Sequence, residues 1–188
     1  MVTKVTIIPR TNGAGGFTLF TPSEDQMESG LYSKKYLEAQ LAVALGGRVA
    51  EELVYGEDEV TTGASNDLQQ VRNIARRMVA QWGFAKETLA PTAWETPDAS
   101  QQMFGGAPTA SDTTERAIDA EVQQIVQQAY TVCYNSLRAN RELLDKVVYD
   151  LLDKETIDTA DMTKLTDEYG VVLSQAEMLE TLELPVAA

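Results

Sequence analysis

Hydrophobic residues recur with helical spacing along most of the chain. Four-residue steps predict a first helix with an N-cap at Ser33, an end near Tyr55 and a stop at Gly56. Its apolar stripe comprises Leu37, Leu41, Leu45, Val49 and Leu53. Steps of three and four predict a second helix, capped by Ser65 and ended by Gly83. Its stripe comprises Leu68, Val71, Ala75, Met78 and Trp82. We expect both stripes to be buried.

The same spacing returns in the second half of the chain. From Asp112 a long helix is predicted, and its stripe comprises Ile118, Val122, Ile125, Ala129, Cys133 and Leu137. We therefore expect Cys133 to be a buried core thiol. A shorter helix follows with the apolar residues Leu143, Leu144, Val147, Val148, Leu151 and Leu152. Asp161 is predicted to cap a helix that ends at Tyr169, and residues 174–188 suit one more short acidic helix.

Strand-like sequence is confined to the N-terminus. The β-branched run 5–8 stops at Pro9, which is typical of an edge strand. A glycine-rich turn over 11–16 leads to a second strand, Phe17–Phe20. No later segment indicates a strand, so the fold class is mainly α with a small N-terminal β-hairpin. The pair Gly46–Gly47 inside the first helix predicts close approach of another helix.

Composition divides the chain into four parts. Residues 1–87 hold the hairpin and the first two helices, and residues 88–111 form a loop rich in Pro and Gly. Residues 112–170 form a helical part of the same domain, and residues 171–188 form an acidic tail. No apolar run approaches the roughly 20 residues that a membrane-spanning helix needs.

Composition excludes several kinds of chemistry. The chain has no histidine and one cysteine, so it holds no Ser-His-Asp triad, no Cys-His pair and no HExxH zinc site. Its net charge is −14, of which residues 1–90 contribute −2 and residues 91–188 contribute −12. Nucleic acid is not an expected partner, because a phosphate backbone needs a basic surface.

The most informative polar segment surrounds Asp67. This carboxylate follows the expected cap Ser65 by two residues, where the helix dipole favours an acid, so it can simply stabilise the start of the helix. Alternatively, Asp67 faces away from the buried stripe and offers a fixed carboxylate to a metal or a partner. Glu51 and Glu52 close the preceding helix and are candidates for supporting acids. Carboxylates alone make a poor zinc site, since zinc usually takes His or Cys ligands.

Three motifs carry a resemblance to a known family. They are VTIIPR at Val5–Arg10, LGGRVAEE at Leu45–Glu52 and TTGASNDL at Thr61–Leu68. In this order and spacing the chain resembles the FtsH family of ATP-dependent, membrane-anchored zinc metalloproteases. The similarity is continuous over residues 4–87 and looser over residues 112–166. Residues 15–25 and 29–33 are most similar in sequence to cyanobacterial and plastid members.

The resemblance implies a helical peptidase domain in a hexameric ring below an AAA+ ATPase ring, acting on protein substrates at the stromal or cytoplasmic face of a thylakoid membrane. Family members bind zinc through two histidines of an HExxH helix and the Asp of the SND motif. Here that Asp is Asp67, the expected third zinc ligand. Glu51, Glu52 and Asn66 are the expected supporting residues. The strand expected to bind an extended substrate by β-addition comprises Val5, Thr6, Ile7 and Ile8.

The chain also departs from the family pattern. It contains neither the HExxH helix with its catalytic Glu nor the ATPase domain that binds ATP, so by itself it holds no catalytic residue and is not expected to bind zinc. One hypothesis is that it is a piece of an FtsH-type protease. The alternative is a proteolytically inactive subunit that docks on a larger, photosynthetic membrane complex. A third hypothesis, resting on charge alone, is that the acidic helices bind a basic partner.

Overall fold

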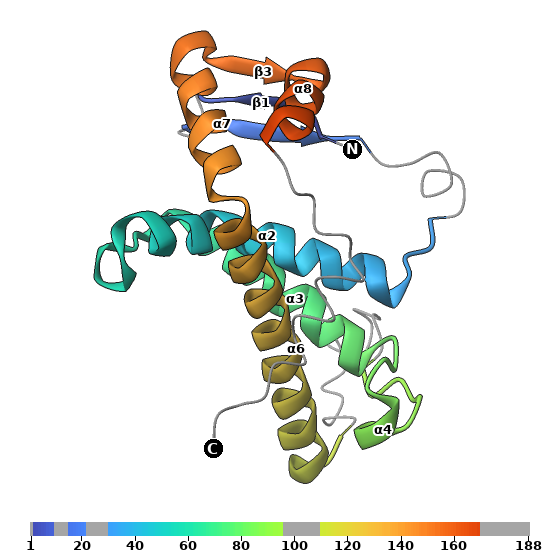
Figure 1. Cartoon of the computed structure of the whole chain (residues 1–188). Coiled ribbons are helices and arrows are strands. Elements are labelled where there is room, and N and C mark those ends of the chain that lie inside the picture. The colour runs from blue at the N-terminus through green and yellow to red at the C-terminus, as the bar shows by residue number, and fades with distance from the viewer. Residues whose placement is uncertain (1, 10–14, 22–29, 96–109, 170–188) are drawn as a thin grey trace. The chain divides into compact units, whose positions relative to one another are not determined.

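A computed structural model describes residues 2–9, 15–21, 30–95 and 110–169 of the chain (Figure 1). The described residues are mainly helical, as predicted. They fall into two compact units, one made of Met1–Tyr32 with Asn135–Ala188 and the other of Ser33–Tyr134. The helix predicted within 174–188 and most of the predicted 88–111 loop lie outside the described residues.

The helices of the Ser33–Tyr134 unit follow the predicted periodicity. They are α2 (Lys34–Tyr55), α3 (Ser65–Ala80), the single turn α4 (Lys86–Leu89) and α6 (Asp112–Ala139) as far as Tyr134. Between α2 and α3 lie two short 3-10 turns, η1 (Glu57–Glu59) and η2 (Thr62–Ala64). α2 and α3 pack side by side (Figure 1).

α2 begins and ends where the sequence predicts. The Ser33 hydroxyl accepts a hydrogen bond from the backbone N–H of Tyr36 at 3.2 Å, which confirms the N-cap. Gly56, at φ +90°, donates its N–H to the carbonyl of Glu52 and ends the helix. The predicted stripe is confirmed as buried at Leu37, Leu41, Leu45 and Val49.

Two expectations for the α2–α3 pair are wrong. A Cβ added at Gly46 or Gly47 would meet no atom within 4 Å, so neither glycine permits a close helix contact within the described part of the chain. Ser65 is not an N-cap, because η2 precedes α3 and is capped by the Thr61 side chain, which accepts from Gly63 N–H. Ser65 instead donates its hydroxyl to the Thr62 carbonyl.

The buried face of α3 is shorter than predicted. Its buried residues are Val71, Ala75, Met78, Val79 and Ala80. Leu68 is 42% exposed, and Ala64 of η2 is the buried residue at that end instead. Trp82 is 38% exposed because α3 ends at Ala80, and its ring lies 4.8 Å from the Arg77 guanidinium.

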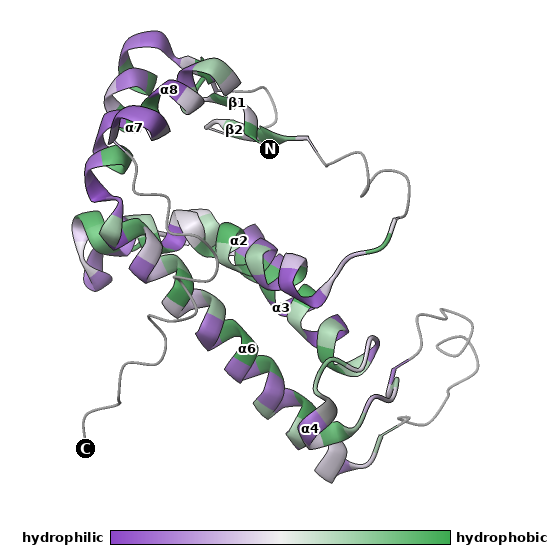
Figure 2. Cartoon of the chain, turned by 45° about the vertical axis from the view of Figure 1, so that its right-hand side comes forward, coloured by the Kyte–Doolittle hydropathy of each residue, from purple (hydrophilic) through white to green (hydrophobic). Residues whose placement is uncertain are grey.

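The predicted face of α6 is confirmed at four of its six positions. Hydrophobic residues alternate with hydrophilic ones along this helix (Figure 2). Ile118, Ile125, Ala129 and Cys133 are buried, whereas Val122 and Leu137 are half-buried. Burial raises the pKa of the Cys133 thiol to about 11, so this side chain is an unreactive part of the core.

The other unit contains a three-stranded antiparallel sheet in the order β2-β1-β3. Its strands are β1 (Val2–Thr6), β2 (Phe17–Phe20) and β3 (Thr156–Asp158), and its helices are α7 (Arg141–Lys154) and α8 (Thr159–Tyr169). Thr6 lies opposite Phe17 on one side and Thr156 on the other. The predictions that the first strand lies at an edge and that no strand follows the hairpin are therefore wrong. Three residues of β3 are too few to produce a periodic pattern.

Backbone geometry explains how β3 reaches β1. Glu155 ends α7 in the left-handed conformation, at φ +59°, and its carbonyl accepts bonds from Ile7 N–H at 3.1 Å and the Thr6 hydroxyl at 3.0 Å. Thr6 is only 4% exposed. A Cβ at Gly16 would lie 2.4 Å from the Thr6 carbonyl oxygen, so only glycine fits there.

The start of α8 also differs from its prediction. Asp158 accepts a hydrogen bond from Asp161 N–H at 3.0 Å, while Asp161 accepts from Asp158 N–H at 3.4 Å. This reciprocal pair is a capping box, with Asp158 as the cap and Asp161 three residues inside it. The prediction that Asp161 itself is the cap was wrong.

Adjacent leucines of α7 provide a matched test of this core. Leu151 is 9% exposed and Leu152 is 68% exposed. We expect Leu151→Ala to lower the free energy of unfolding by about 2–5 kcal/mol, because it leaves a cavity. Leu152→Ala should change it by less than about 0.5 kcal/mol. Urea melts of both variants check this, and equal effects would show that the wrong face of α7 has been assigned to the core.

Candidate functional site

Asp67 lies in the first turn of α3, and its side chain is exposed. That position suits a carboxylate, because the unpaired N–H groups of a helix start carry partial positive charge. Asn66 beside it is also exposed. Both sequence-based interpretations of Asp67 are compatible with this placement, since an exposed carboxylate in a first turn can stabilise the helix and bind a ligand.

Glu51 binds the segment that leads to Asp67. Its carboxylate accepts the backbone N–H of Thr61 at 2.8 Å and the Thr61 hydroxyl at 3.0 Å. The same hydroxyl accepts Gly63 N–H at 3.2 Å. The Thr61 N–H and hydroxyl lower the pKa of the Glu51 carboxyl, because both donors favour its charged form. Sequence reasoning missed Thr61, which the TTGASND motif contains but which carries no obvious chemistry.

Glu52 points to a different partner. Its carboxylate accepts the Tyr130 hydroxyl of α6 at 2.5 Å. Burial, followed by the bond to Glu52, raises the pKa of Tyr130 to about 12. The Tyr130 ring stacks on Tyr134 with 6.1 Å between centroids. The two neighbouring glutamates therefore have separate tasks: Glu51 holds the turn after α2, and Glu52 joins α2 to α6.

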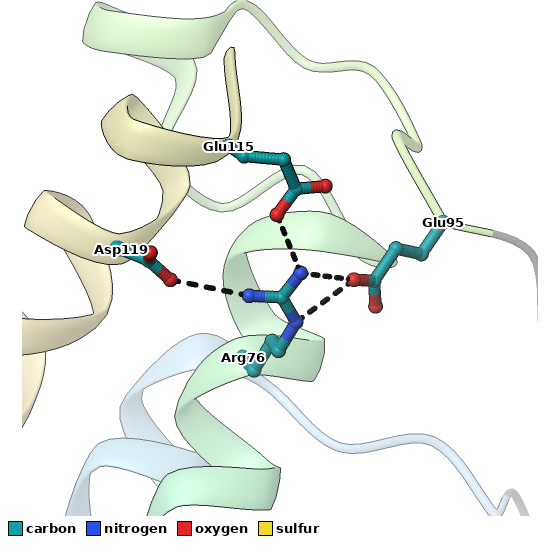
Figure 3. A network of polar contacts seen from close by, with 4 residues as sticks. All are labelled: Arg76, Glu95, Glu115 and Asp119. Atoms are coloured by element: carbon teal, nitrogen blue, oxygen red, sulfur yellow. Dashed lines mark hydrogen bonds and ion pairs between the residues drawn. The ribbon is translucent and has the colours of Figure 1, made fainter. Parts of the chain in front are cut away.

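A network centred on Arg76 connects α3 to two other segments (Figure 3). The guanidinium binds Glu95 at 2.6 Å, Glu115 at 2.7 Å and Asp119 at 3.2 Å. The Arg76 pKa is raised, first by the hydrogen bond to Glu115. Sequence reasoning did not find this Arg76 network, because its acids stand 19 to 43 residues away along the chain.

The described residues do not form a complete zinc site. Among them, no three His, Cys, Asp or Glu side chains gather closely enough to hold a metal ion. The chain has no histidine and so lacks the nitrogen ligands that zinc usually takes, whereas a carboxylate such as that of Asp67 is a ligand type that zinc accepts.

The expected substrate strand is less accessible than predicted. Val5 and Thr6 lie in β1, which is paired on both sides, so β-addition has no free backbone edge there. Ile7 and Ile8 follow the strand and are exposed. Among the described strands, β2 and β3 form the two edges of the sheet.

Comparison with known proteins assigns the chain to a family. The sequence profile of Peptidase family M41 matches residues 1–165, and the chain belongs to that family. ATP-dependent zinc metalloprotease FtsH 3 of Synechocystis sp. is 51% identical over 169 residues, which cover 87% of this chain and 27% of that protein. The chloroplastic ATP-dependent zinc metalloprotease FTSH 1 of Oryza sativa is 44% identical over 167 residues, 87% of this chain and 24% of the relative.

A further cyanobacterial relative matches almost the whole chain. ATP-dependent zinc metalloprotease FtsH of Synechococcus sp. is 44% identical over 192 residues, 99% of this chain and 29% of that protein. The chain thus spans about a quarter of the length of these relatives. The resemblance to the FtsH family is confirmed. In the described residues, no helix is both long and apolar enough to cross a membrane.

Removing the Arg76 guanidinium should weaken the Ser33–Tyr134 unit. In Arg76→Gln three carboxylates lose their cation, and we expect a loss of about 1–3 kcal/mol of unfolding free energy. High salt should reduce the difference in unfolding free energy between Arg76→Gln and the natural chain, because salt screens these part-exposed charges. Arg72→Gln, an exposed arginine on the same helix, should change stability by less than about 0.5 kcal/mol. Equal melting of both variants would contradict this assignment.

The bond between Tyr130 and Glu52 predicts a pH effect. The pKa of Tyr130 is raised from 10.0 to about 12, so folding favours its neutral form. This contribution to stability is full below pH 10.0 and is lost as pH rises toward about 12. Glu52→Gln should lower the Tyr130 pKa only in part, because burial remains. Ultraviolet titration checks this, with Tyr130→Phe identifying the signal; an unchanged titration in Glu52→Gln would rule out the coupling.

Proposed function

We propose that this chain forms part of the peptidase region of an FtsH-type, ATP-dependent zinc metalloendopeptidase that degrades membrane and soluble proteins. The observation that carries the proposal is the exposed Asp67 at the start of α3, within a family match that covers residues 1–165. The relatives bear the name ATP-dependent zinc metalloprotease, and this chain is about half identical to one of them.

In this function Asp67 contributes one ligand to zinc. Asp67 would hold the metal together with further ligands, and the chemistry that zinc would supply is activation of a water molecule for attack on the peptide bond. This chain supplies no histidine ligand, so the proposed metal site requires further ligands that this chain does not contain. The tasks of this chain are to present one carboxylate and to hold it in place. By itself the chain is expected to be inactive.

We further propose partners and a location for this chain. The named relatives are cyanobacterial and chloroplastic proteins, which supports a plastid or a cyanobacterium as the source of this chain. We place it at the stromal or cytoplasmic face of the thylakoid membrane, in a hexamer of FtsH-like subunits with an attached ATPase that binds ATP.

Among the described strands, β2 is better placed than β1 to bind a substrate by β-addition. β2 pairs with β1 along one side, and its other side is an edge of the sheet. Leu19 and Phe20 are about half exposed, so among the described residues of this edge these two offer apolar side chains and extended backbone to a peptide. We propose β2 in place of Val5 and Thr6 as the strand that binds the polypeptide substrate.

The test uses the protein encoded by the natural reading frame that contains this chain. Asp67→Asn should weaken retention of zinc against a chelator by more than about tenfold. Mutation of a residue that only supports a metal ligand already lowers metal affinity by about tenfold or more, so loss of the ligand itself should have a larger effect. Cleavage of casein should fall with zinc retention. Asp58→Asn, an exposed aspartate of η1, is the matched control and should retain both.

Two results would contradict the proposal. Zinc retention that is unaffected by Asp67→Asn would remove Asp67 from the metal site. A natural protein with neither stoichiometric zinc nor casein cleavage, isolated with a defined membrane complex, would favour the inactive docking subunit instead.

A further inference from the structure

We propose that Glu51 is a positioning residue, which acts through Thr61 to hold the η2 turn and thereby the start of α3 with Asp67. The inference rests on the proposed function for its consequence at the metal, but its geometric part concerns this chain alone. It assigns a separate role to each of two adjacent glutamates that the sequence does not distinguish.

Glu51 contacts Thr61 through two hydrogen bonds. Glu51 lies in the last turns of α2, ten residues before Thr61, and accepts both its backbone N–H and its hydroxyl. Two bonds from one residue to one carboxylate fix the direction as well as the position of the chain. The end of α2 and the residue before η2 are therefore joined directly, across the intervening η1 turn.

Further hydrogen bonds extend this restraint toward α3. The Thr61 hydroxyl that donates to Glu51 also accepts Gly63 N–H, so the same side chain caps η2. Ser65 then donates its hydroxyl to the Thr62 carbonyl. Consecutive hydrogen bonds thus run from Glu51 through η2 to the first residue of α3. Asp67 follows two residues later.

Local packing leaves little tolerance in this turn. A Cβ added at Gly63 would lie 3.2 Å from the Thr61 hydroxyl oxygen and 3.7 Å from a Glu51 carboxylate oxygen. Ala64 is buried, which anchors the end of η2 in the core. By contrast Asp67 itself is exposed, and none of the described contacts involves its carboxylate. Its position is therefore determined by the backbone before it.

Amide exchange of the 188-residue chain tests the geometric part. In Glu51→Ala the Thr61 amide loses its acceptor, and we expect the Thr61 and Gly63 amides to exchange about tenfold faster by NMR. Glu51→Gln should have a smaller effect, because its carbonyl still accepts one donor. Thr61→Val should speed exchange of the Gly63 amide, because the hydroxyl that accepts it is lost. Thr61→Ser retains the hydroxyl, so the Gly63 amide should exchange as in the natural chain.

Glu52→Gln is the matched control for amide exchange. This neighbour binds Tyr130, so its replacement should leave the amides of residues 61–67 unchanged. Unchanged exchange at Thr61 and Gly63 in Glu51→Ala would overturn the positioning role. Equally fast exchange of these amides in Glu52→Gln would also overturn the positioning role, since the faster exchange would then come from a general destabilisation of α2.

The protein from the natural reading frame tests the consequence at the metal. Glu51→Ala should weaken zinc retention about tenfold, less than Asp67→Asn does, and Thr61→Ser should retain zinc like the natural protein. If Asp67→Asn releases zinc and Glu51→Ala does not, the proposed function stands and the positioning role fails. If Asp67→Asn has no effect on zinc, the proposed function fails, and amide exchange alone decides the role of Glu51.

Discussion

The arrangement of the Ser33–Tyr134 unit depends on the Arg76 guanidinium. One cation binds three carboxylates, from the segment after α4 and from the first turns of α6. The buried face of α3 packs through apolar contacts, which are non-directional, so a restraint on direction has to come from other contacts. Directional, charge-assisted hydrogen bonds supply that restraint. The Arg76 network therefore links α3 directly to α6 and to the segment after α4.

The other end of α3 is held by different means. There the restraint comes from Glu51 through Thr61 and η2, whereas Glu52 joins α2 to Tyr130 of α6. α2, α3 and α6 are thus connected in pairs by polar contacts at three places, around buried apolar faces. Such an arrangement suits a chain whose proposed task is to present one exposed carboxylate, because that side chain has no described contact to position it.

Sequence was sufficient for the parts of this structure that depend on periodicity. The four-residue repeat of α2 and the long repeat of α6 located both helices and their buried residues, since each repeat extends over several turns. It failed at single residues near helix ends, such as Trp82, where α3 stops before the side chain reaches the core. It also missed β3 and the acids of Arg76, because pairing between distant segments leaves no local pattern. The motif located Asp67, but only the structure separated the partners of Glu51 and Glu52.

The uneven charge of the chain acquires a partial structural explanation. Many acids of the second half serve as partners within the fold: Glu115 and Asp119 bind Arg76, Asp150 binds Lys146, and Asp161 binds Lys154. Ion pairing with the few available cations thus accounts for some of the carboxylates in α6, α7 and α8. They cannot balance the charge, because residues 91–188 contain 18 acidic and only 6 basic residues. The excess therefore gives this half a net negative charge, and long-range repulsion from it opposes the binding of other acidic molecules.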